Sequence, residues 1–408
     1  MDSKITSLLF SILLSISCTV LNSQISTAEY KLQNDSLSNQ SNTTIGGYGN
    51  AVYQRNVDQK FSKINLDRFV LFTGHKFNKQ ISFFSELEVE DAKVSGGEEV
   101  GEIAIEQCYL KFNVNASNYF VAGLFLPRIG ILNENHLPNT FNGNERTQVE
   151  TYILPSTWRE LGVGYYGSIN KLPLSYSLAL VNGLNSATFE HGSTIREGRY
   201  EGRNAGANNL AITGSAQLYT GNLKTQISGY YGGSVSLAPR EADSLKLTSG
   251  IFGTPVLIGE ADMQYEVNGF SAKILGTIIS IPEVSDINRA YANNTPQAAY
   301  GAYAEIAYNL FESMHKFKSQ QMILFARFEK LNMNAKIPEN GITDGTLNQQ
   351  HFITGLTYLP IRNVAIKVDI RMFHTGSQNT DLIINPGIAE IPYKKNNTLI
   401  NMGIGLSF

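Results

Sequence analysis

The chain has 408 residues, of which 42% are hydrophobic, 10% are aromatic and only 16% are charged. Soluble domains usually carry charges on about a quarter of their residues, and a formal net charge of -3 excludes the basic footprint of a nucleic-acid-binding protein. The 20 tyrosines, 21 phenylalanines and 36 glycines favour β structure with many turns.

The first residues are typical of an export signal. A lysine precedes the mostly apolar run ITSLLFSILLSISCTV, which is too short for a spanning helix and is followed by small or polar residues. We expect residues 1–23 to be a signal peptide that is cleaved near Ser23. Lipid modification of Cys18 is the alternative, although the residues before it make a poor recognition sequence. After cleavage Cys108 would be the single cysteine, so no internal disulfide could form.

The rest of the chain predicts strands. Residues 24–45 are polar and rich in Ser, Asn and Gln, and we expect them to form a flexible periplasmic leader. From residue 46 onwards, apolar and polar residues alternate over segments of about ten residues, as in strands that separate lipid from a polar lumen. No later stretch is long and apolar enough for a transmembrane helix. We therefore predict that residues 46–408 form an all-β protein, a transmembrane antiparallel β-barrel of about 16 strands, at 46–54, 64–74, 80–90, 102–113, 117–126, 158–167, 173–182, 209–219, 222–232, 256–267, 270–280, 298–310, 321–330, 350–359, 363–373 and 398–408.

The predicted links between strands alternate in length. Links after odd-numbered strands have about 9 to 31 residues, whereas those after even-numbered strands have about 2 to 10. Asn268-Gly269 is a two-residue hairpin signal. Outer-membrane barrels have short periplasmic turns and long extracellular loops, and an even number of strands leaves both termini in the periplasm. The pattern therefore indicates long extracellular loops and short periplasmic turns.

Charged residues gather on one face of several predicted strands. In NVAIKVDIRMF, alternate residues from Val364 to Met372 are apolar and the residues between them include charged side chains. Rows of carboxylates are costly against lipid but stable in a water-filled lumen. In 102–113 the apolar face changes near Gln107 and Cys108, which a β-bulge would explain. The residues that we expect to line the lumen are Glu86, Glu88, Glu90, Glu260, Asp262, Glu266, Glu305, Arg327, Glu329, Lys367, Asp369 and Arg371.

The last segment, TLINMGIGLSF, alternates apolar with small or polar residues up to Phe408. Closing a barrel pairs the last strand with the first, so a chain that ends in a strand is expected. The terminal aromatic residue resembles the assembly signal read by the barrel-assembly machinery of Gram-negative bacteria. This resemblance implies that machinery and outer-membrane lipid as partners, and the outer membrane of a Gram-negative bacterium as the location.

The longest predicted loop, Pro127–Thr157, is longer than a loop that only joins two strands needs to be. In general diffusion porins the third loop folds into the barrel and narrows the channel. Here the third loop has apolar residues suited to packing on an inner wall, and its charged residues could border the opening. The alternative is an ordinary extracellular loop on the barrel rim. The candidate constriction residues are Arg128, Glu134, His136, Glu145, Arg146, Glu150 and Arg159.

The run GLFLPRIGILNENHLPNTFNGNERTQVETYILPSTWRELGVGYYG resembles the porins of Bacteroidetes-type bacteria, which are distant relatives of the phosphate-selective porin O/P family. The stretch from Val181 to Tyr219 resembles them as well, so the resemblance covers roughly residues 80–220. It implies a sixteen-stranded pore, a homotrimer and the passage of small anions.

Phosphate selectivity does not carry over directly from this family. Phosphate-selective members line the lumen with arginines and lysines, whereas the expected lumen here is mainly acidic, and an acidic lining repels phosphate. Arg196, Arg199 and Arg203 in the fourth loop could reverse the field locally, or they could belong to a solvated loop.

The sequence contains no motif of a known catalytic site. The six histidines are scattered, and there is no HExxH, no CxxC pair, no phosphate-binding glycine loop and no GxSxG. Glu134 and His136 have a spacing that could suit a metal, but no nearby cysteine or second histidine completes the site. We therefore expect no enzyme activity, no metal and no cofactor.

These patterns favour an outer-membrane porin, a passive diffusion channel for small hydrophilic solutes or ions that is narrowed by an inward-folded third loop (127–157). The alternative is a non-conducting barrel that acts as an adhesin or structural protein through loops at 183–208, 233–255 and 374–397. A barrel that transports hydrophobic molecules would require an apolar lumen, which the rows of carboxylates contradict.

Overall fold

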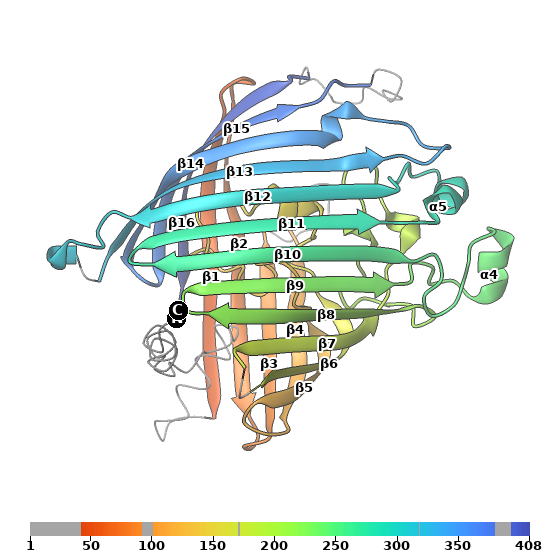
Figure 1. The fold of residues 1–408 in the computed structure, drawn as a ribbon, viewed down its shortest axis with the longest axis horizontal. Coiled ribbons are helices and arrows are strands. Elements are labelled where there is room, and N and C mark those ends of the chain that lie inside the picture. The colour runs from red at the N-terminus through yellow and green to blue at the C-terminus, as the bar shows by residue number, and fades with distance from the viewer. Residues whose placement is uncertain (1–41, 92–100, 170–171, 318, 380–392) are drawn as a thin grey trace, which may run out of the picture.

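The computed structural model describes residues 42–91, 101–169, 172–317, 319–379 and 393–408. Sixteen antiparallel strands form one closed barrel in which sequence neighbours pair (Figure 1), so the predicted fold class is confirmed. The strands are β1 (Thr43–Asn56), β2 (Phe61–Lys76), β3 (Ile81–Glu90), β4 (Ile103–Asn113), β5 (Asn118–Phe125), β6 (Glu160–Ile169), β7 (Leu174–Asn182), β8 (Leu210–Thr220), β9 (Leu223–Gly232), β10 (Val256–Val267), β11 (Phe270–Ser280), β12 (Ala298–Asn309), β13 (Gln321–Lys336), β14 (Asn348–Ile361), β15 (Val364–Thr375) and β16 (Asn396–Ser407).

The N-terminal predictions are covered only in part. The expected signal peptide, residues 1–23, and most of the expected leader, 24–45, lie outside the described residues. The first strand begins at Thr43, inside the last residues of the predicted leader.

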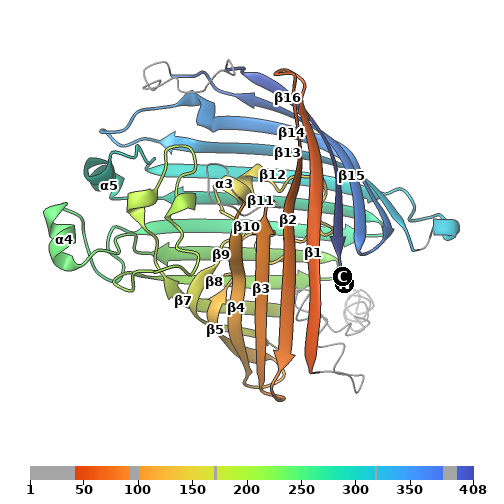
Figure 2. The ribbon, with the colours of Figure 1, turned by 180° about the vertical axis from the view of Figure 1, so that it is seen from behind.

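Pairing of the first strand with the last closes the barrel. β1 and β16 lie side by side (Figure 2) in a register that places Tyr48 opposite Ser407. Phe408 follows the last strand and exchanges backbone hydrogen bonds with Gly47, at 2.8 and 3.0 Å. This pairing completes the sheet and leaves no free edge between β1 and β16.

The two faces of the strands differ in chemistry as the alternation predicts. In β15 the apolar side chains of Val368 and Ile370 face outwards and are 42% and 41% exposed. The charged side chains of Lys367 and Asp369, which alternate with them, face the interior and are 4% and 2% exposed. A side-chain period of two residues sends every second residue to the same face, so β15 has an apolar outside and a charged inside.

Long and short links lie at opposite ends of the barrel. The links after odd-numbered strands include 126–159, 183–209 and 233–255, and helices α4 (Pro239–Ser244) and α5 (Val284–Tyr291) stand at that end (Figure 1). The opposite end has tight turns such as Asn268-Gly269, where both residues have positive φ, as a two-residue hairpin requires. The first link is shorter than predicted, because β1 and β2 extend to a turn at 57–60.

A β-bulge in β4 explains the change of apolar face in this strand. Glu86 pairs with Gln107 and Leu87 pairs with Ile105, so Glu106 is an extra residue without a partner on β3. Glu106 and Gln107 both point into the barrel, and Cys108 returns to the outer face. The bulge therefore adds a carboxylate to the interior.

The interior of the barrel holds the largest apolar cluster. Residues of the link 126–159, among them Ile129 and Trp158, pack there with inward-facing aromatic side chains such as Tyr166 and Tyr230. A short helix in the same link is α3 (Gln148–Tyr152). None of the helices in the described ranges has the length and apolar character needed to cross a membrane.

A charge on the outer face tests the contact of β15 with lipid. Ile370→Arg places a guanidinium among apolar neighbours on that face, and we expect a loss of about 2–4 kcal/mol in the free energy of unfolding if the position lies near the bilayer midplane. The measurement is equilibrium unfolding from lipid vesicles. Ile370→Val is the control and should change stability little, and an arginine variant as stable as the wild type would contradict a lipid-facing position.

Candidate functional site

Link 126–159, called loop 3 below, contacts inward-facing side chains on strands far from it in the sequence. Lys367 on β15 donates to the backbone carbonyls of Phe141 (2.7 Å) and Gly143 (2.8 Å). The Asp369 carboxylate accepts from the backbone N–H (2.8 Å) and side chain (2.6 Å) of Asn144. These bonds hold the tip of loop 3 against the inner face of β15.

Arginines reinforce the same contact. Arg371 on β15 forms a 2.6 Å ion pair with Glu145 of loop 3. Arg327 on β13 forms ion pairs with Glu305 (3.1 Å) and Glu329 (2.8 Å), and Glu329 accepts the backbone N–H of Gln148 at 2.6 Å. Each buried charge in this group has an opposite charge or hydrogen-bonding partner, which is the condition for placing charges in an interior.

Six predicted lumen residues therefore point inwards but are covered by loop 3 instead of lining open water. They are Glu305, Arg327, Glu329, Lys367, Asp369 and Arg371, none of them more than 8% exposed. The two-residue period of the strands determines that these side chains point inwards, whereas loop 3 is what shields them from solvent.

A second polar cluster lies between loop 3 and the strands at the start of the barrel. Arg68 on β2 lies 3.3 Å from the Glu88 carboxylate, and Gln107 donates to Glu86 at 2.9 Å. Glu106, at the bulge, accepts from the Thr157 hydroxyl at 2.7 Å. The sequence pattern identified the two glutamates on β3 but not Glu106, for which the only signal was the change of face in β4.

His136 of loop 3 joins this cluster. Burial, with the nearby guanidinium groups of Arg146 and Arg68, lowers the pKa of His136 to about 4, so the imidazole is neutral at pH 7. Its Nδ1 donates to the Asn133 carbonyl at 3.1 Å. The Tyr48 hydroxyl lies 2.9 Å from both His136 Nε2 and a carboxylate oxygen of Glu106, so one proton serves two acceptors.

The arrangement resembles a metal site only in part. Ligand atoms of Glu86, Glu106 and His136 lie within 4.8 Å of one another, and such groups can hold a divalent cation. However, Arg68 and Arg146 already act on the Glu106 carboxylate with positive charge. A hydrogen-bonded ion cluster accounts for the geometry.

Near its two ends, loop 3 is held by an ion pair and hydrogen bonds within the loop and by a hydrogen bond to the barrel wall. Near its start, Arg128 pairs with Glu134 at 2.8 Å. Glu150 accepts the backbone N–H groups of Ile131 and Leu132, both at 2.7 Å, and the Tyr303 hydroxyl of β12 at 2.7 Å. Burial raises the pKa of Glu150, and these donors offset part of that rise.

The predicted carboxylates of β10 occupy two environments. Glu260 accepts from Ser228 and from Gln226, and Asp262 accepts from Gln264 at 3.1 Å. Both carboxylates are buried in the barrel interior. Glu266 lies nearer the end with the tight turns and is exposed.

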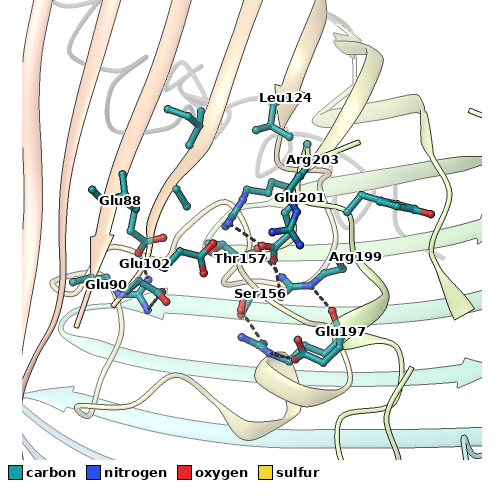
Figure 3. Close-up of a pocket in the computed structure, with 18 of the residues that line it drawn as sticks. Glu88, Glu90, Glu102, Leu124, Ser156, Thr157, Glu197, Arg199, Glu201 and Arg203 are labelled. Atoms are coloured by element: carbon teal, nitrogen blue, oxygen red, sulfur yellow. Dashed lines mark hydrogen bonds and ion pairs between the residues drawn. The ribbon is translucent and has the colours of Figure 1, made fainter. Parts of the chain in front are cut away.

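Two cavities lie at the two ends of the barrel. The outer cavity, about 1180 Å³, is lined by β3, β4, the end of loop 3 and the fourth loop (183–209), with Arg146 and Arg159 among its residues. Figure 3 shows Glu88 and Glu90 on one side of this cavity. The inner cavity, about 440 Å³, lies at the end with the tight turns, where loop 3 contributes residues 139–142 and β10 contributes Glu266. Loop 3 thus contributes to the lining of both.

Arginines of the fourth loop bind the end of loop 3. Arg199 donates to the carbonyls of Pro155 (2.9 Å) and Thr157 (3.0 Å), and Arg196 donates to Thr151 at 2.7 Å. Glu201 bridges Arg199 (2.8 Å) and Arg159 (2.9 Å). Burial lowers the pKa of Arg199 to about 10, which leaves it charged at pH 7. The solvated-loop interpretation therefore fits Arg203, which is exposed, but not Arg199.

Comparisons with solved structures agree on the fold. No family model matches the chain. An uncharacterized protein of Aquifex aeolicus (strain VF5) is 28% identical over 352 residues, which are 83% of this chain and 78% of that protein. Three solved structures are similar over 90% of this chain. The outer-membrane channel DcaP of Acinetobacter baumannii is 13% identical over 97% of that chain, with a TM-score of 0.53. OmpF of Salmonella typhi in complex with daunomycin is 11% identical over 97% of that chain (TM-score 0.53), and the anion-selective porin of Comamonas acidovorans is 10% identical over 100% of that chain (TM-score 0.52). At these identities the likeness concerns the fold, which is a porin-like barrel.

Acidification tests the ion pair at the tip of loop 3. Burial alone would raise the pKa of Glu145, but Arg371 and other donors hold it below its ordinary value of 4.5. The ion pair is therefore complete above pH 4.5 and is lost as the pH falls through the lower pKa of the folded state. Hydrogen exchange of residues 139–148, corrected for the intrinsic effect of pH, should rise only in that acid range. Glu145→Gln should exchange faster at pH 7 and lose the acid step, and an unchanged acid step in that variant would assign it to another group.

Proposed function

We propose that this protein is an outer-membrane porin, a channel through which small hydrophilic solutes or ions diffuse passively. The observation that carries the proposal is the chemistry of the two faces: a closed barrel with an apolar outside encloses cavities lined by charged and polar side chains. Such a lining is suited to hydrated solutes and gives no advantage to hydrophobic ones. Likeness in fold to the DcaP channel supports the same function.

In this proposal loop 3 sets the width of the channel. The support comes from its position between the cavities: residues 139–142 line the inner cavity, and Arg146, Ser156 and Thr157 line the outer one. The predicted constriction residues would then act by different means. Glu145 and Glu150 would hold the loop, whereas Arg146 and Arg159 would face the solute.

Lumen residues that loop 3 leaves accessible would set the ion preference. The charged residues of the inner cavity are Glu266, Glu312 and Lys273, so this end is acidic. An acidic mouth favours cations or neutral solutes over phosphate. We therefore propose a channel related in architecture to the phosphate-selective porin O/P family but without its selectivity.

The remaining parts of the proposal concern export and assembly. Residues 1–23 would direct export as a signal peptide and 24–45 would form a periplasmic leader. Phe408 would serve as the signal for the barrel-assembly machinery, and the mature barrel would form a homotrimer in the outer membrane of a bacterium of Bacteroidetes type.

One observation favours the alternative, a non-conducting barrel that acts as an adhesin or structural protein. Around the loop tip, the space bounded by Gly143–Arg146, Arg327 and Arg371 leaves no room for a water molecule. Conduction would then need a path beside the tip or a displacement of it, whereas an adhesin would need neither.

Planar bilayers distinguish the two candidates. The purified protein should give stable ionic current, and the reversal potential in a salt gradient should indicate cation preference. Asp369→Ala removes the acceptor of three hydrogen bonds, two of them from Asn144, so we expect a larger or noisier conductance as the tip loosens. Asp243→Asn, on exposed α4, is the control. Absence of current in both the wild type and Asp369→Ala would favour the adhesin.

A disulfide tests whether loop 3 folds inwards in the membrane. A Cβ atom built on Gly405 of β16 would lie 2.7 Å from Cβ of Pro138, close enough for a disulfide after a small shift. Pro138→Cys/Gly405→Cys, in a Cys108→Ser background, should therefore oxidise readily and resist alkylation until reduced. Pro138→Cys/Gly221→Cys is the control pair, because nothing lies within 4 Å of a Cβ on Gly221. Equal alkylation of both pairs would place loop 3 outside the barrel.

A further inference from the structure

The outer cavity has two walls of opposite formal charge. On the side of β3 and β4, Glu88, Glu90 and Glu102 lie together (Figure 3). Arg68 of β2 also lines this side. The opposite side has four arginines against two glutamates: Arg159, Arg196, Arg199, Arg203, Glu197 and Glu201. Counting these groups, the excess is two negative charges on one wall and two positive charges on the other, and Arg146, which also lines the cavity, adds one further positive charge.

Some of these charges are free to bind a solute. On the negative wall, Glu102 is exposed, and Glu90 lies 3.8 Å from Arg68 and is likewise accessible. On the positive wall, Arg203 is exposed. Among the described residues, neither Glu102 nor Arg203 has a side-chain hydrogen bond or ion pair.

Buried donors at the cavity point to a ligand as well. Arg159 is 6% exposed, and its Nε atom is buried without a hydrogen-bond partner although its Nη2 binds Glu201. Nη2 of Arg146, which also lines the cavity, is likewise buried without a partner. A buried guanidinium N–H without an acceptor is costly, and an anionic group in the cavity would supply one.

We propose that the outer cavity binds zwitterionic solutes such as amino acids and short peptides, with the ammonium group towards Glu90 and Glu102 and the carboxylate towards Arg203 and Arg159. The inference rests on the proposed channel function and names its solute class. A solute with one sign of charge is attracted by one wall and repelled by the other, whereas a zwitterion aligned across the cavity is attracted by both. A neutral polyol gains from neither wall.

The size of the outer cavity and the strength of solute binding are suited to the passage of a zwitterion. The cavity of about 1180 Å³ exceeds the volume that a dipeptide needs. Exposed ion pairs are weak and are screened by salt beyond about 8 Å at physiological ionic strength. The solute is therefore oriented and concentrated at the outer mouth but is released readily, as conduction requires.

Liposome swelling measures this selectivity. In vesicles with the wild-type protein, glycylglycine should enter about two to five times faster than erythritol, a neutral solute of similar size, as expected for one or two exposed ion pairs. Glu102→Gln/Arg203→Gln should bring the ratio to about one without changing the rate for erythritol. The control Arg240→Gln/Glu339→Gln alters exposed residues that do not line the cavity and should keep the wild-type ratio. A ratio unchanged by Glu102→Gln/Arg203→Gln would overturn the proposal.

A second readout separates the binding site from the channel. Saturation-transfer NMR of glycylglycine with the detergent-solubilised protein detects weak binding at the outer cavity without conduction. Saturation transfer to glycylglycine should therefore be seen with the wild type but not with Glu102→Gln/Arg203→Gln. If erythritol does not enter the vesicles at all, the channel function fails, and the NMR titration then decides alone. A saturable change that needs both charges supports the zwitterion site, and its absence overturns it.

Discussion

Closure of the sheet is the constraint on which the rest of the molecule depends. In hydrocarbon no water replaces a missing hydrogen bond, so a strand at a free edge would expose a row of unpaired backbone groups. Pairing of β16 with β1 leaves neither of the terminal strands with a free edge. Once the sheet is closed, each side chain of a strand has two destinations, the lipid or the interior. The exposed Ile370 and the buried Asp369 of β15 follow from that choice.

The periodicity that creates these two destinations is why the fold could be predicted from the sequence. Alternation located all sixteen strands and the direction of the charges on β10, β13 and β15. Strand ends were less predictable, because β1 and β2 continue past the last clear alternation to a turn at 57–60. The bulge at Glu106 marks another limit: the pattern shows that the face changes but cannot tell which residue is inserted.

The surroundings of the interior charges could not be predicted in the same way. Asp369 receives two of its three hydrogen bonds from Asn144, which is 225 positions away and has a neutral side chain without any periodic signal. Arg199 binds carbonyl groups of Pro155 and Thr157, and backbone acceptors do not depend on residue type. Local patterns determine which way a side chain points, whereas its partner depends on where a long loop lies in three dimensions.

The reach of loop 3 also has a consequence for the order of folding. Asn139 donates to the carbonyl of Arg362 and to the hydroxyl of Ser407, near the end of the chain. The loop therefore cannot complete its contacts until the C-terminal strands are in place, although it is synthesised long before them. Contacts this distant in sequence carry a large loop-closure entropy and form slowly. A segment from the first half of the chain would thus be among the last to settle, against a wall that has already assembled.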